Sequence, residues 1–350
     1  MASDKAQTVG QGELALGPLS DYLKAGRPDL RGEPRARQIS GGQSNPTFFL
    51  SFDNRELVLR KQPAGQLLPS AHAVDREYRV MAALADQGVP VPRMVLYEED
   101  PALLGTKFYV MERLDGRVFH DSQLPELAQG DRAAAYHDLA TVLARLHSVD
   151  VAGAGLSDFG RYGSYFERQI ARWTKQWHLS KTREIPDIDA LAAWLPQNIP
   201  ADDRTTIVHG DYRIGNVMLH PTAPEIVGVL DWELSTLGHP FADLAHTQTL
   251  WFITPEEYGG VMGIDFAAQG LPTREAFEET YLQAAGISEG LKPFHLAFAL
   301  FRFGVIFEGI AARALDGSAA STNAAEVGKL SSVLAARAAD ILSGDRSWKG

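Results

Sequence analysis

The chain has 350 residues, and because a domain averages about 150 residues we expect two domains or one unit of two lobes. Its composition, 45% hydrophobic and 22% charged, is that of a globular protein and excludes disordered and collagen-like classes. The 44 Asp and Glu outnumber the 33 Lys and Arg, giving a net charge of −11, so no overall positive field favours nucleic acid or anionic lipid. The absence of cysteine excludes disulfides, thiolate zinc sites and cysteine nucleophiles.

Nothing in the sequence predicts export or a membrane span. The first 25 residues lack a basic start followed by an unbroken apolar run. The most apolar stretch, residues 295–315, carries Arg302, Glu308 and Arg313, which is too much charge for a bilayer core. We therefore expect a cytoplasmic protein with no membrane partner.

The first third of the chain is predicted to be rich in strands. Residues 1–37 form a leader with one short helix, and two strands at 48–52 and 57–60 form a hairpin. Apolar residues at helical spacing then predict a helix over 74–84. A further strand at 108–111 runs into charged residues and glycine, which places a boundary between an N-terminal lobe, residues 1–113, and a C-terminal lobe, residues 114–350.

The second lobe is predicted to be mainly helical, with one strand-rich insert. An apolar stripe predicts a helix over 134–147, and the chain from residue 266 onward reads as helices. Between them, β-prone runs at 205–208 and 217–219 flank a polar loop, and a further strand follows at 226–230. The fold class expected is therefore α+β.

The polar loop carries the most informative residues. It reads His-Gly-Asp-Tyr-Arg-Ile-Gly-Asn over residues 209–216, and the strand after it ends at Asp231. We expect Asp211, Asn216 and Asp231 to converge, since short strands deliver all three to loop ends. Magnesium prefers oxygen ligands, so Asn216 and Asp231 suit a metal that also holds nucleotide phosphates. Asp211 is then left to act as a base toward a hydroxyl group.

This pattern, His-x-Asp-x4-Asn followed by a strand-borne Asp, resembles the catalytic and metal-binding loops of the protein-kinase-like superfamily. His-Gly-Asp at 209–211 and Asp-Trp-Glu at 231–233 are similar to the branch that holds aminoglycoside phosphotransferases and choline kinases. The resemblance covers residues 38–315 and implies a two-lobed fold with a small strand-rich N-lobe. Residues 60–79 look closest to phosphotransferase domains fused to, or encoded beside, acyl-CoA dehydrogenases.

The resemblance implies an ATP-dependent kinase for small molecules, with Mg²⁺ as cofactor. In that reading Asp211 is the base, Asn216 and Asp231 are the magnesium ligands, and Arg213 is the cation beside the transferred phosphate. His209 is predicted to support the loop by hydrogen bonds, and Asp243 resembles the buried Asp that holds the catalytic loop in this family.

The N-lobe supplies the residues predicted to bind nucleotide. Either Arg60 or Lys61 clamps the phosphates, because neighbouring strand residues face opposite sides, and we favour Arg60. Glu77 on the next helix would pair with that cation, or with a neighbouring surface arginine. Backbone from Glu112 to Leu114 would contact adenine. A glycine-containing loop before the hairpin is predicted to contact phosphate, or forms an ordinary turn; its residues are Gly41, Gly42, Ser44 and Asn45.

Two further patterns are interpreted as structural. Asp158-Phe159-Gly160 spells the kinase metal triplet but precedes the catalytic loop, so we interpret it as a turn. The pairs His137/His147 and His239/His246 lack carboxylates at ligand spacing, and we interpret them as surface or capping residues.

The phosphate acceptor stays open between several chemistries. The subgroup resemblance suggests a hydroxyacyl-CoA and a functional link to an acyl-CoA dehydrogenase, whereas the wider family suggests an aminoglycoside or other amino sugar. The donor is ATP or GTP. A competing hypothesis is a nucleotide-binding pseudokinase that serves as an interaction module, although such a protein has no need of Asp211.

Overall fold

The structure, a computed structural model, describes residues 14–39, 45–65, 72–317 and 324–344. The chain divides into two compact units, which are described separately below. The first contains residues 1–116 and also 227–233, and the second contains residues 117–226 and 234–350. The chain therefore returns to the first unit for one short segment after it has entered the second.

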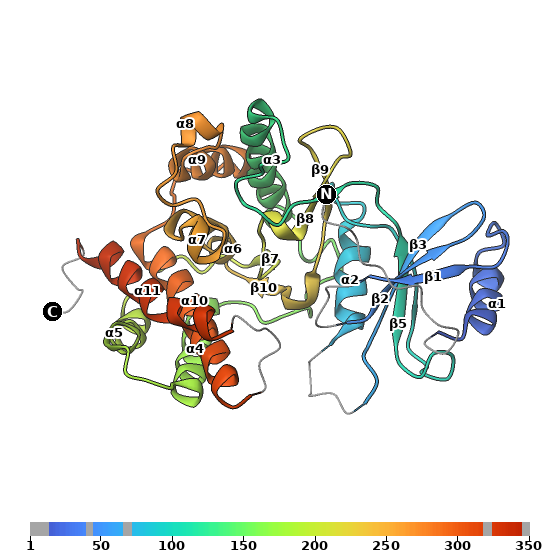
Figure 1. Ribbon diagram of the computed structural model, residues 1–350, viewed down its shortest axis with the longest axis horizontal. Helices are drawn as coiled ribbons and strands as arrows, with labels where there is room; N and C mark the ends of the chain where they lie inside the picture. The colour runs from blue at the N-terminus through green and yellow to red at the C-terminus, as the bar shows by residue number, and fades with distance from the viewer. Residues whose placement is uncertain (1–13, 40–44, 66–71, 318–323, 345–350) are drawn as a thin grey trace. The chain divides into compact units, whose positions relative to one another are not determined.

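The first unit is built on a five-stranded antiparallel sheet in the order β1-β2-β3-β5-β4 (Figure 1). The predicted hairpin is β2 and β3, in register with Thr47 opposite Arg60, and its turn closes through a hydrogen bond from the Phe52 amide to the Arg55 carbonyl. The strands are β1 (Arg35–Gln38), β2 (Thr47–Ser51), β3 (Glu56–Lys61), β4 (Met94–Glu98) and β5 (Phe108–Glu112).

One helix lies on each side of this sheet (Figure 1): α1 (Leu16–Gly26) and α2 (Val74–Leu84). The bounds of α2 are those predicted. Its apolar stripe packs inward, and α1 contributes Leu19 and Leu23 to a core shared with the sheet. Glu77 is a charged residue on the buried side of α2. Such a position requires polar partners, since burying an unpaired charge is costly.

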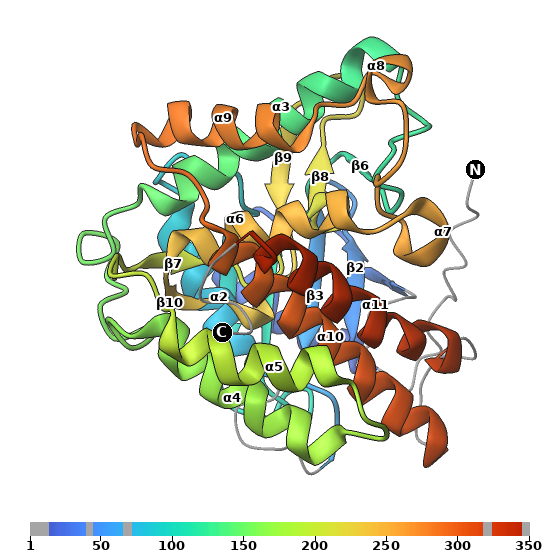
Figure 2. The same cartoon turned by 90° about the vertical axis from the view of Figure 1, so that its left-hand side faces the viewer.

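The second unit is organised around α10 (Pro293–Leu315), which runs beside α11 (Ala324–Leu342) in Figure 2. Among the described residues α10 is the one helix long and apolar enough to cross a membrane, but 72% of its apolar window is buried inside the protein, as expected of a core helix. The other helices are α3 (Gln129–His147), α4 (Tyr165–Ser180), α5 (Pro186–Trp194), α6 (Pro240–Gln248), α7 (Pro255–Tyr258), α8 (Phe266–Gln269) and α9 (Arg274–Ala285).

Short strands in the second unit frame the polar loop. β7 (Thr206–Val208) pairs with β10 (Thr236–Gly238), and β6 (Arg117–Val118) pairs with β8 (Val217–Leu219). All of β7 is buried, so packing in the core fixes the position at which the loop begins. The strand that follows β8, β9 (Ile226–Val229), leads to the segment that returns to the first unit.

Candidate active site

The loop between β7 and β8 has a backbone that only a few residue types accept. Gly210 has φ +86°, and a Cβ placed there would lie 2.7 Å from the carbonyl oxygen of Leu234. Glycine is therefore needed both for the left-handed backbone and for the close approach. Residues Ile214–Asn216 then form a 3-10 turn that points Asn216 back toward Asp211.

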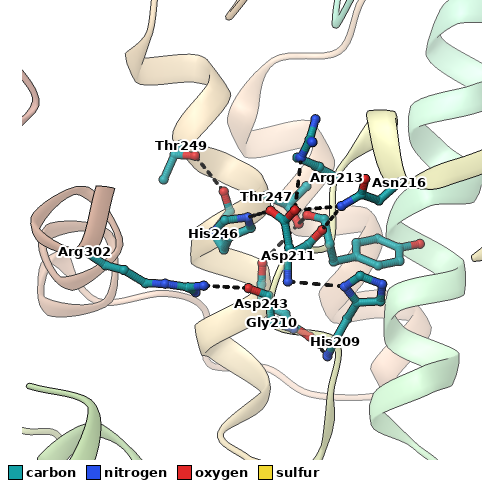
Figure 3. Close-up of polar contacts among 11 residues, drawn as sticks. His209, Gly210, Asp211, Arg213, Asn216, Asp243, His246, Thr247, Thr249 and Arg302 are labelled. Atoms are coloured by element: carbon teal, nitrogen blue, oxygen red, sulfur yellow. Dashed lines mark hydrogen bonds and ion pairs between the residues drawn. The ribbon is translucent and has the colours of Figure 1, made fainter. Parts of the chain in front are cut away.

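Asp211 is surrounded by donors (Figure 3). The Asn216 amide nitrogen donates to Oδ2 of Asp211 at 2.7 Å and to its backbone carbonyl at 2.9 Å. Arg213 Nε lies 3.4 Å from the same Oδ2, and His246 Nε2 lies 2.8 Å from Oδ1. Both of these contacts use the side-chain nitrogen of Asn216, and its carbonyl oxygen takes part in neither.

These contacts keep Asp211 ionised. Burial alone would raise the pKa of Asp211, but the hydrogen bond from His246 and the charge of Arg213 lower it well below its usual range. Burial lowers the pKa of His246, and the Asp211 carboxylate only partly opposes this. In this pair the Asp211 carboxylate is the acceptor, and Nε2 of His246 is therefore the donor.

Helix α6 holds the rest of the loop. Asp243 accepts hydrogen bonds from the backbone amides of His209, at 2.6 Å, and Gly210, at 2.9 Å, as the resemblance implied. Thr247 donates to the carbonyl of Tyr212. Burial would raise the pKa of Asp243, but the hydrogen bond from His147 and the Gly210 amide hold it below its usual value.

Two further contacts fix the loop from outside α6. The ring of His209 accepts a hydrogen bond from the Asp211 amide at 3.2 Å, which confirms its supporting role. Arg302 on α10 donates to the Gly210 carbonyl at 2.8 Å.

In the first unit the predicted ion pair forms around Glu77, which is 1% exposed. Arg60 Nε lies 3.2 Å from Glu77 Oε2, while Lys61 points elsewhere and donates to the Leu104 carbonyl. Tyr109 donates to the same Glu77 oxygen at 3.0 Å. The structure therefore places Arg60, and not Lys61, beside the predicted anion.

Asp231 also belongs to the first unit, on the segment that returns to it. Arg60 lies 3.4 Å from Asp231 Oδ1 and 4.0 Å from Glu233. Asp231 has φ +64°, a left-handed conformation that is uncommon outside glycine and, when observed, often marks a functional site. The structure thus joins Asp211 to Asn216 in one unit and Asp231 to Arg60 in the other.

The remaining nucleotide-binding predictions have varied outcomes. Gly41, Gly42 and Ser44 lie outside the described residues. Asn45 is buried and turns its amide nitrogen to Glu77 at 2.8 Å, so this nitrogen supports the ion pair. Contact of Glu112 and Leu114 with adenine stays a prediction; both are half-buried, at the end of β5 and just after it.

The patterns interpreted as structural include two corrections. The first is His147, which is neither a surface residue nor a cap: its side chain is 3% exposed and contacts Asp243 and Tyr281. Asp158–Gly160 forms turn and bend structure, as expected. In the described part of the chain no group of three or more His, Asp or Glu could hold a metal ion. His239 caps α6 by accepting from the Phe241 amide, but His246 is neither exposed nor a cap: it is 5% exposed and bonded to Asp211.

Sequence reasoning therefore missed His246 and Tyr109. A signal for His246 was present, because it follows Asp243 by three residues and so lies on the same face of a helix. Tyr109 carried no such signal: its contact with Glu77 depends on the pairing of β3 with β5, which sets Tyr109 opposite Arg60.

Comparison with known proteins places these features in a family. The family model described as "Phosphotransferase enzyme family" matches residues 35–290. Mouse acyl-CoA dehydrogenase family member 10 is 42% identical over 312 residues, which cover 87% of this chain and 29% of that protein. The chain spans less than half the length of the curated relatives it matches.

Solved structures agree with this relationship. A protein of Ralstonia eutropha JMP134, provisionally described as an aminoglycoside phosphotransferase, has a TM-score of 0.87 at 42% identity, covering 93% of this chain and 98% of that one. A thermostable mutant of aminoglycoside phosphotransferase APH(4)-Ia, in complex with AMP-PNP and hygromycin B, has a TM-score of 0.60 at 16% identity, covering 94% and 99%, and shows the fold alone. The predicted kinase-like fold and subgroup resemblance are confirmed.

Proposed function

Because the chain belongs to the phosphotransferase enzyme family, we propose that it transfers the γ-phosphoryl group of ATP to a hydroxyl group of a small molecule. The observation that carries this proposal is the carboxylate of Asp211, which is ionised, part-exposed and held by three donors. A carboxylate fixed in this way suits the orientation of a hydroxyl group. A protein that only binds nucleotide has no need of such a group.

As ligands of a magnesium-bound nucleotide we propose Asn216 and Asp231. The side-chain carbonyl oxygen of Asn216 and the carboxylate of Asp231 are hard oxygen ligands of the kind that Mg²⁺ takes. When bound, Mg²⁺ supplies positive charge that neutralises the phosphates. Arg60, fixed by Glu77, would add charge at the phosphates of the donor.

The chain's own residues would then perform the transfer by positioning. Asp211 orients the acceptor hydroxyl, whose oxygen bonds to the γ-phosphorus while the bond to the β–γ bridging oxygen breaks and ADP leaves. The hydroxyl proton passes to Asp211. Arg213, with half of its side chain exposed, would keep Nε beside Asp211 and turn the outer nitrogens of its guanidinium toward the transferred group. Guanidinium matches phosphate oxygens in a two-pronged contact.

For the acceptor we favour a hydroxyacyl-CoA. This rests on the names of the relatives, which join a segment similar to this chain to an acyl-CoA dehydrogenase, and it carries with it the proposed functional link to such an enzyme. An aminoglycoside or other amino sugar is the second candidate, because the 42% identical solved structure is provisionally described as an aminoglycoside phosphotransferase.

The test is ATP consumption by the full chain, with Mg²⁺, across hydroxyacyl-CoAs, aminoglycosides and choline-like alcohols. We expect one class to be phosphorylated and Asp211→Asn to lower kcat at least about 1000-fold while Mg-ATP still binds. Asp340→Asn, an exposed aspartate on α11, is the matched control and should behave as wild type. Mg-ATP binding without phosphorylation of any acceptor would favour the pseudokinase hypothesis, and full turnover by Asp211→Asn would remove Asp211 from its role.

A further inference from the structure

His246, at the C-terminal end of α6, is the buried contact of Asp211 that the family resemblance did not supply. Its Nε2 lies 2.8 Å from Asp211 Oδ1, and the side chain is 5% exposed. We propose that His246 is a positioning residue, whose Nε2–H fixes the direction in which Oδ1 of Asp211 meets the acceptor hydroxyl. This inference rests on the proposed function, in which Asp211 orients that hydroxyl.

The imidazole is held by one ring contact and by the helix that carries it. The ring stacks on Phe303 of α10, with ring centroids 5.0 Å apart and an interplanar angle of 11°. On its own helix it is preceded by Asp243 and followed by Thr247, which both bond the backbone of the loop. A one-turn slide of α6 or a turn of the ring would therefore break other contacts. Nε2 is held at one place, as a positioning group requires.

The distribution of donors over the two carboxylate oxygens points to Oδ1 as the reacting atom. Oδ2 receives the Asn216 amide at 2.7 Å and faces Arg213 at 3.4 Å. In the described part of the chain Oδ1 receives His246, and a carboxylate oxygen has two lone pairs. The second lone pair of Oδ1 is therefore the one available to a hydroxyl, and the His246 bond sets its direction.

The role assigned to His246 needs a donor but not a charge. Buried and stacked on an aromatic ring, the imidazole is in the setting that favours its neutral form. A neutral donor orients the carboxylate without adding a full positive charge beside the oxygen that must accept a proton. A neutral side chain with a donor at the same reach should therefore replace it.

Three substitutions separate this role from simple packing. Gln can place its amide nitrogen near the position of Nε2, Asn reaches only as far as Nδ1, and Leu has no donor. We expect His246→Leu and His246→Asn to lower kcat about 100-fold, while KM for ATP changes less than about twofold. The His246→Gln variant should retain a kcat within about fivefold of wild type. Equal losses of kcat in the Gln and Leu variants, or full kcat in the Leu variant, would overturn the inference.

The control is His295→Gln, which removes another buried imidazole from the same unit; His295 is 2% exposed and lies on α10. It should keep kcat even if stability falls. Loss of kcat in this control equal to that in His246→Leu would assign the effect to packing and overturn the inference.

A spectroscopic readout keeps the inference testable even if no acceptor is found. In protein labelled with ¹⁵N-histidine, the signal lost in His246→Gln should be that of an Nε2–H tautomer, and Asp211→Asn should shift it. An Nδ1–H tautomer, or a signal that Asp211→Asn leaves in place, would contradict the positioning role. If the wild-type protein phosphorylates no acceptor while this signature is present, the proposed function is wrong. The hydrogen bond from His246 to Asp211 is then still confirmed.

Discussion

Glu77 is a buried carboxylate whose position depends on three different side chains. Oε1 accepts from Asn45 at 2.8 Å, and Oε2 faces both Arg60, at 3.2 Å, and Tyr109, at 3.0 Å. Burial raises the pKa of Glu77, while Arg60 and the two hydrogen bonds oppose that rise. A buried pair of this kind stabilises little by itself, but leaving one partner unpaired is costly. The function of the set is to keep Arg60 in place.

Tyr109→Phe removes one oxygen atom and so tests whether these contacts of Glu77 keep Arg60 in place. The change leaves Glu77 with one donor fewer, which should lower stability by about 1–2 kcal/mol and raise KM for Mg-ATP several-fold with little change in kcat. Thermal unfolding and steady-state kinetics measure the two effects. The matched control is Tyr22→Phe, since Tyr22 also donates to a glutamate, Glu98, but at an exposed site of the same unit. Equal effects of the two changes would contradict the argument.

For single residues, the sequence predicted which residue types the site contains better than it predicted which residues contact one another. Strand alternation showed that Arg60 and Lys61 face opposite sides, but not which side holds Glu77, because that depends on where α2 packs. Asn45 was predicted to contact nucleotide since it follows glycines, and this stays a prediction; the bond of its amide nitrogen to Glu77, 32 residues away, was not predicted. Contacts across such separations follow from the pairing of elements, which the local sequence does not encode.

Helix α6 is the element that organises the loop of residues 209–216, which we propose to be catalytic. It is nine residues long, and all nine are buried. His239 caps it and Pro240 starts it, so its first turn is fixed. Three of its residues, Asp243, His246 and Thr247, contact three successive parts of the loop. Spacings of three and four place them on one face of the helix.

Asp243→Asn should release the loop from this helix. In the wild type both carboxylate oxygens accept backbone amides, and Asn offers one oxygen and two N–H donors, so one buried amide loses its acceptor. We expect a loss of about 3 kcal/mol in stability and a fall in kcat larger than the change in ATP affinity. Thermal unfolding, together with kinetics on the folded fraction, checks both.

The control for this change is Asp265→Asn. Asp265 caps α8 by accepting from the Ala268 amide, and Asn caps helices about as well as Asp. Stability close to wild type is expected there. A similarly small effect in Asp243→Asn would show that α6 does not hold the loop.

Several elements with a clear apolar period were predicted from the sequence, but not all of them. The hairpin β2–β3 and the bounds of α2 follow the pattern of the sequence. α4 was missed although Phe166, Ile170, Trp173 and Trp177 are spaced as a helical stripe. β1, which reads Arg-Ala-Arg-Gln, gave no such signal, whereas β4, which reads Met-Val-Leu-Tyr-Glu, is a short apolar run that was not assigned. Such strands form because neighbouring strands supply their hydrogen bonds.

On the scale of the whole molecule, the return of residues 227–233 to the first unit is what no linear division of the sequence could predict. The Val229 amide donates to the Pro90 carbonyl, and Asp231 lies beside Arg60, 171 residues earlier. Predicted strands on both sides of residue 220 gave no sign that they would lie in different units, since both are short and apolar. Assignment to units depends on packing.

The stability of the second unit should depend on two buried histidines. The rings of His239 and His295 stack with centroids 5.9 Å apart, and both are at most 2% exposed. Burial lowers the pKa of His239 to about 4 and that of His295 to about 3, against an unfolded value of about 6.5. Burial would raise the pKa of Asp202, but Arg204 lowers it to about 2, so Asp202 stays ionised beside His239.

These directions set the sign of a pH dependence. Above about pH 7.5 both histidines are neutral in the folded and unfolded chain, so they contribute no slope. Between about pH 6.5 and 4 the unfolded chain binds protons that the folded chain does not, and the free energy of unfolding falls as pH falls. Each histidine contributes at most about 1.4 kcal/mol per pH unit. His295→Gln removes one of the two and keeps an acceptor for the Lys292 amide.

We therefore expect the free energy of unfolding to fall less steeply from pH 6.5 to 4.5 in His295→Gln than in wild type. Urea unfolding followed by tryptophan fluorescence measures this, because Trp177 and Trp194 lie in the second unit. Carboxylates that titrate in the same range contribute equally to both proteins and cancel in the comparison. The exposed-site control His137→Gln should keep the wild-type slope. Parallel slopes for wild type and His295→Gln would mean that His295 accepts its proton equally well in the folded chain, contrary to its burial.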